Sequence, residues 1–311
     1  MDNKNRIFSL VQSIERVIVG KREPIRQVIS ALLCNGHILI EDVPGVGKTQ
    51  LVASLSKSLG GKFNRIQLTP DIMPSDIAGF SMVNQKTFEF EYKDGAAMCN
   101  FLLADEINRA SPKAQSSLLE IMEEYQISLD GVTHKLPRPF MVLATQNPVE
   151  TYGTYHLPEA QMDRFFMKIS IGYPSESEEI TIIERTESHN PIENITEAVL
   201  TLDDIIELQD QVKKVMVSPE LKQYIVSIVN ATRNNDNAVL GISPRGSIAL
   251  FKAARANAFI SGRDFVIPDD IKAMATCVLA HRLIISPKGK NTYGSAEKLI
   301  EQLLTEINVP M

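Results

Sequence analysis

Apolar residues in the first half of the chain gather in short runs that show no helical period. The clearest runs cover residues 38–40, 100–104 and 140–144, and weaker candidates cover 63–68 and 166–171. Such runs are typical of parallel strands that are buried on both faces. Apolar positions at helical spacing lie between and before them, at residues 5–18, 23–34, 50–55 and 111–125. This alternation predicts an α/β fold built on a parallel sheet.

The pattern changes after Tyr173-Pro174-Ser175, a turn signal that marks a boundary. Beyond it the sequence shows helical periodicity and no convincing strand. The helical segments cover residues 176–188, 202–215, 219–234, 246–260, 269–284 and 295–306. Because a chain of 311 residues is long for one core, we predict two domains. An α/β domain spans residues 1–172, and an all-helical domain spans residues 173–311.

Two stretches of the first domain predict β-hairpins. Residues 87–92 alternate apolar and acidic side chains and are followed by the turn signal Lys93-Asp94-Gly95, which predicts a projecting arm. Such an arm either touches a substrate or is only a decorated surface loop. Residues 127–136 turn at Asp130-Gly131 and predict a second hairpin.

A glycine-rich loop follows the first strand and leads into a helix, with the sequence EDVPGVGKT from Glu41 to Thr49. Its glycines let backbone N–H groups turn onto a polyphosphate, and the helix N-terminus adds partial positive charge. Lys48 would then reach the β- and γ-phosphates, while the Thr49 hydroxyl would coordinate Mg²⁺. The general pattern has glycine where this chain has Asp42, a residue type that tolerates left-handed backbone angles. The alternative is a glycine turn that merely precedes a lysine.

Polar residues also end the other two clear strands. Asp105 and Glu106 follow one of them, and Asn147 follows the other. The carboxyl ends of parallel strands face the crevice where ligands of open α/β sheets bind. There Asp105 can hold Mg²⁺ through its water shell, Glu106 can orient and deprotonate a water, and Asn147 can hydrogen-bond that water or the γ-phosphate. The alternative for Asn147 is a residue that only starts the turn at Pro148.

Two arginines are candidates for contacts with phosphate groups. Arg245 stands in the first turn of a predicted helix, where a cation gains nothing from the helix dipole and is better explained by a phosphate partner. Its alternative is a surface arginine. Arg164 lies in a short, highly charged helical turn, where it either acts on a neighbouring subunit or forms an ion pair with Asp163 or Glu159.

Composition narrows the class of protein. The hydrophobic content of 44% and the charged content of 23% describe an ordinary globular protein. The net charge of −6 and the lack of a Lys/Arg run argue against a nucleic-acid partner. No signal-like apolar segment and no apolar run of about 18–20 residues is present, so we expect a cytoplasmic protein without a membrane span.

The chain resembles the MoxR branch of the AAA+ ATPases. The resemblance rests on segments that run in the family's order: 41–49, 103–110, 144–148, 157–165 and 243–246. Asp42 also fits that branch. The resemblance implies a P-loop three-layer αβα core with a C-terminal helical lid, and it implies that residues 71–98 contain the helix-2 insert of the branch.

The resemblance also implies roles for individual residues. Lys48 and Thr49 would be the Walker A residues, Asp105 and Glu106 the Walker B residues, and Asn147 sensor 1. Arg164 would be the arginine finger, and Arg245 the sensor 2 arginine. The remaining residues expected at the nucleotide are Val19 and Gly20 beside the adenine, and Asp42, Val43, Pro44, Gly45, Val46, Gly47 and Gln50 around the phosphates.

Members of this branch form rings, usually hexamers, and act as chaperone-like ATPases with von Willebrand factor A (VWA) domain proteins. We therefore expect ATP and Mg²⁺ as cofactors, a homo-oligomeric ring, a VWA-domain partner and a protein client. Three alternatives remain: a nucleotide-gated scaffold with negligible turnover, a DNA-directed AAA+ motor, and a small-molecule kinase.

Overall fold

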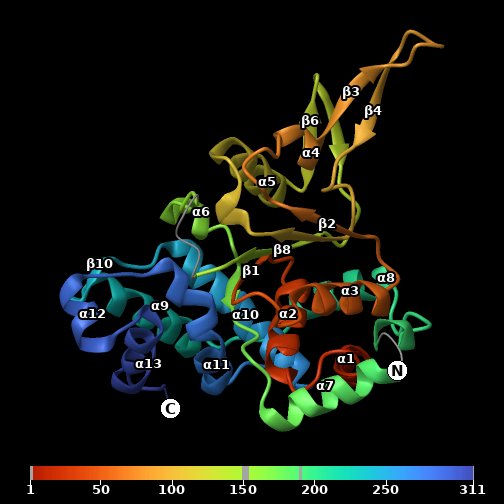
Figure 1. Ribbon diagram of the computed structural model, residues 1–311. Helices are drawn as coiled ribbons and strands as arrows, with labels where there is room; N and C mark the ends of the chain where they lie inside the picture. The colour runs from red at the N-terminus through yellow and green to blue at the C-terminus, as the bar shows by residue number, and fades with distance from the viewer. Residues whose placement is uncertain (1–2, 149–153, 189–190, 311) are drawn as a thin grey trace.

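The structure, a computed structural model, describes residues 3–148, 154–188 and 191–310. Its centre is a five-stranded sheet with the strand order β2-β5-β8-β1-β9, in which all neighbouring strands are parallel (Figure 1). The strands are β1 (Ile38–Glu41), β2 (Phe63–Gln67), β5 (Phe101–Asp105), β8 (Met141–Gln146) and β9 (Met167–Ile169). The predicted α/β fold with a parallel sheet is confirmed, although β9 is shorter than the apolar run suggested.

Alternate residues of the central strands enter two different hydrophobic cores. On β5, Phe101 and Leu103 enter one core, and Leu102 and Ala104 enter the other. The helices of the first core are α1 (Asn3–Glu15), α2 (Arg22–Leu33) and α3 (Lys48–Ser58), and those of the second are α4 (Pro74–Ala78) and α5 (Pro112–Glu124). Figure 1 shows these two groups on opposite sides of the sheet, so the domain has the predicted αβα layers.

Helices dominate the chain after the sheet. They are α7 (Glu176–Ser188), α8 (Leu202–Val212), α9 (Pro219–Arg233), α10 (Pro244–Ile260), α11 (Pro268–Leu279), α12 (Pro287–Tyr293) and α13 (Ala296–Glu306), with the short 3-10 helices η2 (Pro191–Asn194) and η3 (Ala280–Arg282). Residues of α8 to α11 and of α13 join the same core that α1 and α2 close. The helical lid is thus confirmed, whereas a domain boundary between residues 172 and 173 stays a prediction.

Two short strands correct the expectation that nothing beyond residue 173 forms a sheet. β10 (Ala238–Leu240) pairs with β11 (Ile284–Ile285) in an antiparallel ladder. Each is too short to show an alternating pattern, so periodicity does not reveal them. The helix α12 was also not predicted, because seven residues are too few to show a clear helical period.

Both predicted hairpins are present. β3 (Gly79–Val83) pairs with β4 (Phe90–Asp94), and β6 (Gln126–Leu129) pairs with β7 (Val132–Lys135). Figure 1 shows the β3–β4 hairpin reaching away from the body of the molecule, and Phe88 and Phe90 on it are 82% and 78% exposed. The projecting arm is therefore confirmed, and its role stays open.

In the part of the chain that the structure describes, no helix combines the length and apolar character needed to cross a membrane.

Candidate functional site

The loop between β1 and α3 has the backbone shape that its glycines predict. Gly45 and Gly47 adopt φ values of 88° and 91°, in the left-handed region that a side chain disfavours. Gly47 is also the N-cap of α3, so the N–H groups of the first helical turn, beginning at Lys48, point into the loop. The predicted succession of strand, loop and helix is confirmed.

A polar cavity of about 330 Å³ lies beside this loop. Its lining residues are Pro44, Gly45, Gly47, Lys48, Thr49, Gln50, Arg65, Gln67, Asp105, Glu106, Thr145 and Asn147. They come from the glycine loop and from the carboxyl ends of β2, β5 and β8, which are adjacent in the sheet. The fold thus gathers the polar residues predicted from strand ends at one edge of the sheet.

Lys48 lies between the loop and the carboxylates at this edge. Its Nζ donates a hydrogen bond to the carbonyl oxygen of Asp42 at 2.6 Å. Burial lowers the pKa of Lys48, and the negative charges of Asp42, Asp105 and Glu106 oppose that shift. The ammonium group is therefore partly desolvated and already directed into a site built for charge.

The two acidic residues at the end of β5 are held by different partners. Asp105 accepts hydrogen bonds from Thr145 Oγ1 at 3.1 Å and from Arg65 Nε at 2.7 Å. Glu106 adopts a left-handed φ of 58°, and its backbone N–H donates to Thr145 Oγ1 at 2.9 Å. Thr145 therefore links β8 to both residues and fixes the unusual backbone turn that separates them.

Two further basic residues approach the carboxylates. Arg65 pairs with Asp105, and Arg109 Nη1 lies 3.0 Å from Glu106 Oε2. Sequence reasoning missed Arg65 and Gln67 as cavity residues. Their signal was the alternation of Phe63, Arg65 and Gln67 along β2, which puts the three side chains on one face.

Asp42 has a structural role that the glycine loop pattern did not suggest. Its Oδ2 accepts hydrogen bonds from Ser170 Oγ at 3.0 Å and from the N–H groups of Ile171 and Gly172 at 2.6 and 2.8 Å. Its Oδ1 accepts from its neighbour Val43 N at 3.1 Å. The Asp42 carboxylate thus joins the start of the loop to the segment that follows β9, and neither Asp42 nor Val43 lines the polar cavity.

An apolar cavity of about 270 Å³ adjoins the polar one. Its lining residues are Val17, Ile18, Val19, Lys21, Gly45, Val46, Gly47, Gln50, Pro174, Ile182 and Pro191, of which Gly45, Gly47 and Gln50 also line the polar cavity. Val19 is one of these lining residues, and Gly20 is not. Gly20 packs against the side chain of Glu178, which leaves no room for a Cβ atom. That these two residues lie beside an adenine stays a prediction.

Arg164 and Arg245 lie together in a different place. Both pair with Glu123 of α5: Arg164 Nη2 is 3.3 Å from Oε2, and Arg245 Nη2 is 2.9 Å from Oε1. Both line a separate cavity of about 300 Å³, and neither is among the described residues that line the polar or the apolar cavity. Among the described residues, the alternative ion pair of Arg164 with Asp163 or Glu159 does not form: Arg164 pairs with Glu123, and Asp163 pairs with Arg282.

The arrangement therefore has two parts. One contains a glycine loop, a lysine, a threonine, two carboxylates and an asparagine around a single cavity, beside an apolar pocket. Its chemistry suits a ligand with a polyphosphate at one end and a flat apolar group at the other. The second part contains Arg164 and Arg245, whose side chains are partly exposed and can contact a molecule that binds next to α5.

Two family profiles match the chain. The profile of the ATPase family associated with various cellular activities (AAA) matches residues 37–167. The profile of the AAA lid domain matches residues 230–303. The two matches fall on the αβα layers and on the helices that follow them.

Several known proteins are similar over nearly the whole chain. YeaC, an uncharacterized protein of Bacillus subtilis, is 51% identical over 301 residues, covering 97% of this chain and 94% of the relative. The chaperone MoxR1 of Mycobacterium tuberculosis is 41% identical over 306 residues, covering 96% and 80%. Among solved structures, a provisionally assigned ATPase from Cytophaga hutchinsonii has a TM-score of 0.92 and 38% identity, covering 99% of this chain and 96% of that one.

Proposed function

Because the chain belongs to the MoxR family of AAA+ ATPases, we propose that it hydrolyses ATP in the polar cavity and uses this reaction to remodel or activate protein clients. The observation that carries the proposal is the gathering of Lys48, Thr49, Asp105, Glu106 and Asn147 around one cavity beside the glycine loop. Each of these groups has a separate task in phosphoryl transfer.

The cavities fit a nucleotide. The glycine loop and the first turn of α3 would hold the phosphates, with the Lys48 ammonium on the β- and γ-phosphates. An ideal Cβ at Gly45 meets no atom within 4 Å, so the loop has open space beside it. The adjoining apolar pocket, with Val19 in its wall, would take the adenine, and Gln50 lies at the junction of the two cavities.

The oxygen donors also suit Mg²⁺. The Thr49 hydroxyl and the Asp105 carboxylate would hold the ion, which prefers oxygen ligands and neutralises charge on the phosphates. Asp105 is engaged by Arg65 and Thr145, so its carboxylate is oriented before any ion arrives. When Mg²⁺ binds Asp105, we expect the Arg65 side chain to leave that carboxylate and turn toward the phosphates.

Hydrolysis needs a water aligned with the γ-phosphate. Glu106 is the proposed general base, and Asn147 would hold the same water or a γ-phosphate oxygen. The hydrogen bond from Glu106 N to Thr145 Oγ1 fixes the backbone of the base, and the half-exposed carboxylate remains accessible to water.

The two arginines would act between subunits. Since Arg164 and Arg245 line neither the polar nor the apolar cavity of the described chain, we propose that they complete the active site of a neighbouring copy in a ring, most simply a hexamer. There they would stabilise charge on the γ-phosphate, a contribution that reaches on the order of 10³–10⁵ in rate for an arginine supplied in trans. Glu123 would hold both guanidinium groups until a phosphate competes for them.

The client side of the proposal rests on the relatives. The Mycobacterium tuberculosis relative is named a chaperone, and we propose chaperone-like action for this chain, with a VWA-domain protein as partner and the cytoplasm as location. The projecting β3–β4 arm, in the middle of the 71–98 insert, offers exposed aromatic residues to a client.

A turnover assay tests the proposal directly. The purified chain should release phosphate from ATP in the presence of Mg²⁺ and stop when EDTA is added, and its mass in solution with ATP should exceed that of a monomer. Nucleotide binding with turnover no greater than that of a Glu106→Gln control would identify a scaffold instead. Turnover that requires DNA would identify a DNA-directed motor, against the net charge of −6.

A further inference from the structure

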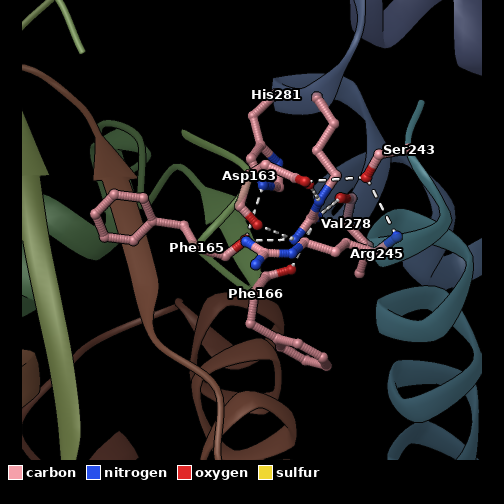
Figure 2. Close-up of polar contacts among 8 residues, drawn as sticks. Asp163, Phe165, Phe166, Ser243, Arg245, Val278 and His281 are labelled. Atoms are coloured by element: carbon pink, nitrogen blue, oxygen red, sulfur yellow. Dashed lines mark hydrogen bonds and ion pairs between the residues drawn. The ribbon is translucent and has the colours of Figure 1, made fainter. Parts of the chain in front are cut away.

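Arg282 places a buried guanidinium group against the segment that precedes β9. Its side chain is 3% exposed, and it lies at the end of η3, directly after α11. Nε donates to Asp163 Oδ1 at 2.7 Å, and Nη2 donates to the carbonyl oxygen of Phe165 at 2.6 Å. Nη1 donates to the carbonyl oxygens of Val278 and Phe166. The guanidinium is therefore hydrogen-bonded on every side, and Figure 2 labels its partner residues Asp163, Phe165, Phe166 and Val278.

The partner carboxylate extends this contact to the start of α10. Asp163 Oδ2 accepts a hydrogen bond from Ser243 Oγ at 2.9 Å, and the same Ser243 Oγ accepts one from the backbone N–H of Arg245 at 3.2 Å (Figure 2). Asp163 is the neighbour of Arg164 in the chain. A continuous series of polar contacts thus runs from Arg282 to the backbone of both arginines that were assigned to the subunit interface.

Packing around Arg282 is tight enough to transmit its position. An ideal Cβ at Gly246, one residue after Arg245, would come within 2.3 Å of Ile242 Cγ2 and within 3.3 Å of Arg282 Cδ. The first turn of α10 therefore rests directly on the stem of Arg282, and a shift of one displaces the other.

A contribution to folding stability does not by itself explain why an arginine stands at position 282. Moving a guanidinium out of water is costly, and a well-packed apolar side chain of similar volume often gives equal or greater stability. What an apolar side chain does not supply is direction, because the planar fork of arginine fixes the angles of the groups that it binds. The chemistry of the residue therefore points to the placement of its partners.

We propose that Arg282 is a positioning residue that sets where Arg164 and Arg245 stand relative to each other. The inference rests on the proposed function, in which both arginines act on the nucleotide of a neighbouring subunit. The two oxygens of Glu123 are each held by one of these arginines, at 3.3 and 2.9 Å, so the guanidinium groups converge on a single anion. Two oxygens of a phosphate can be held in the same way only while that spacing is kept.

Arg282→Met tests the inference, and Arg263→Met is the matched control. Arg263 forms an equally close pair with a buried carboxylate, with Nη1 and Nη2 at 2.6 and 2.7 Å from the two oxygens of Asp270. It lines neither the polar cavity nor the cavity that Arg164 and Arg245 line. We expect Arg282→Met to lower kcat by roughly 10- to 100-fold, because small misplacements of transition-state groups have effects of this order. The KM for ATP should change little, since the phosphate loop is intact. The control should lose stability with kcat unchanged.

Mixing of subunits separates a positioning role from damage to the whole chain. An Arg282→Met subunit keeps its own polar cavity, but its Arg164 and Arg245 are misplaced. A Lys48→Ala subunit has these arginines in place, so mixing the two variants should restore hydrolysis. Mixing with Arg164→Ala subunits should not, because both variants then lack the same contribution. Recovery with the first and none with the second supports the inference.

Three results would overturn it. The first is wild-type kcat in Arg282→Met. The second is a loss that Lys48→Ala subunits do not repair although they repair Arg164→Ala. The third is full activity of Arg164→Ala alone, which refutes the proposed trans role itself and the positioning role with it. If Arg282→Met does not fold, Arg282→Lys gives the same readings, since lysine keeps the charge and loses the fork.

Discussion

The carboxylate of Asp42 accepts a hydrogen bond from the backbone N–H of Ile171 at 2.6 Å. It joins the beginning of the phosphate loop to the end of the sheet domain, because Ser170 and Gly172 donate to the same oxygen. The aspartate that departs from the general phosphate-loop pattern is thus an anchor for a distant segment.

Replacement of Asp42 by the glycine of the general pattern should therefore weaken the protein. Asp42→Gly leaves the N–H groups of Ile171 and Gly172 without their acceptor, which we expect to lower the free energy of unfolding by about 1–3 kcal/mol. Asp42→Asn keeps an acceptor oxygen for these donors and should lose less. Urea denaturation of the three proteins measures the difference, and unchanged stability in Asp42→Gly would refute the anchor.

Glu106→Gln should bind ATP and Mg²⁺ and lose most turnover. The amide keeps the shape of the side chain but does not take a proton from water, and loss of a general base costs on the order of 10²–10⁴ in rate. Lys48→Ala should instead lose productive binding, because the phosphates lose their cation. Equilibrium binding and steady-state kinetics distinguish the two variants, and wild-type turnover in Glu106→Gln would remove it from the mechanism.

Arg164→Ala should bind ATP and hydrolyse it poorly, and mixing with Lys48→Ala subunits should restore part of the activity. In a mixed ring, the Lys48→Ala subunit supplies the arginine and the Arg164→Ala subunit supplies the intact cavity. Specific activity should also rise with protein concentration, since hydrolysis then depends on assembly. A dilute monomer that works at the full rate, or no recovery after proven subunit exchange, would contradict the trans role.

His37 should make the protein sensitive to acid. It is buried directly before β1, where Nδ1 accepts from Val142 N at 3.0 Å and Nε2 donates to the Met122 carbonyl oxygen at 2.8 Å. Burial lowers the pKa of His37 from 6.5 to about 4, so the unfolded chain binds the proton more tightly than the folded one. The stability that neutral His37 contributes is therefore complete above pH 6.5 and is lost as the pH falls from 6.5 to about 4.

The loss from this single group amounts to about 3 kcal/mol by pH 4. His37→Gln should show a smaller fall in unfolding free energy between pH 7 and pH 4, measured by denaturant titration at each pH. His156→Gln is the control for loss of a histidine, because His156 is exposed and lies outside the buried surroundings of His37. An unchanged fall in His37→Gln would show that other groups cause the acid sensitivity.

The parts of the site that could be predicted from sequence are those whose signals are local. The phosphate loop, the acidic pair after β5 and Asn147 after β8 each follow a strand that the apolar pattern reveals. Parallel pairing then brings strand ends to one edge, so the cavity follows from topology. The parallel sheet was accessible for the same reason, whereas its three αβα layers were implied by the family resemblance.

The parts that could not be predicted depend on the approach of distant elements. Nothing near Arg164 in the sequence indicates Glu123, because the two meet only when α5 packs beside the segment that precedes β9. The pair of Arg282 and Asp163 likewise requires the lid to close against that segment. The contact of the Asp42 carboxylate with Ile171 also joins distant segments, and no local pattern indicates it.

The strand order has a consequence for the growing polypeptide on the ribosome. β1 is the first strand of the sheet to be made, yet its partners are β8 and β9: Ile38 pairs with Leu143 and with Met167. One edge of this apolar strand stays unpaired until the chain has reached Gln146, and the other until it has reached Ile169, which exposes both to wrong pairing with other chains. Because Ile171 and Gly172 hold the carboxylate of Asp42 at the start of the phosphate loop, we expect nucleotide to bind too late to guide the early steps of folding.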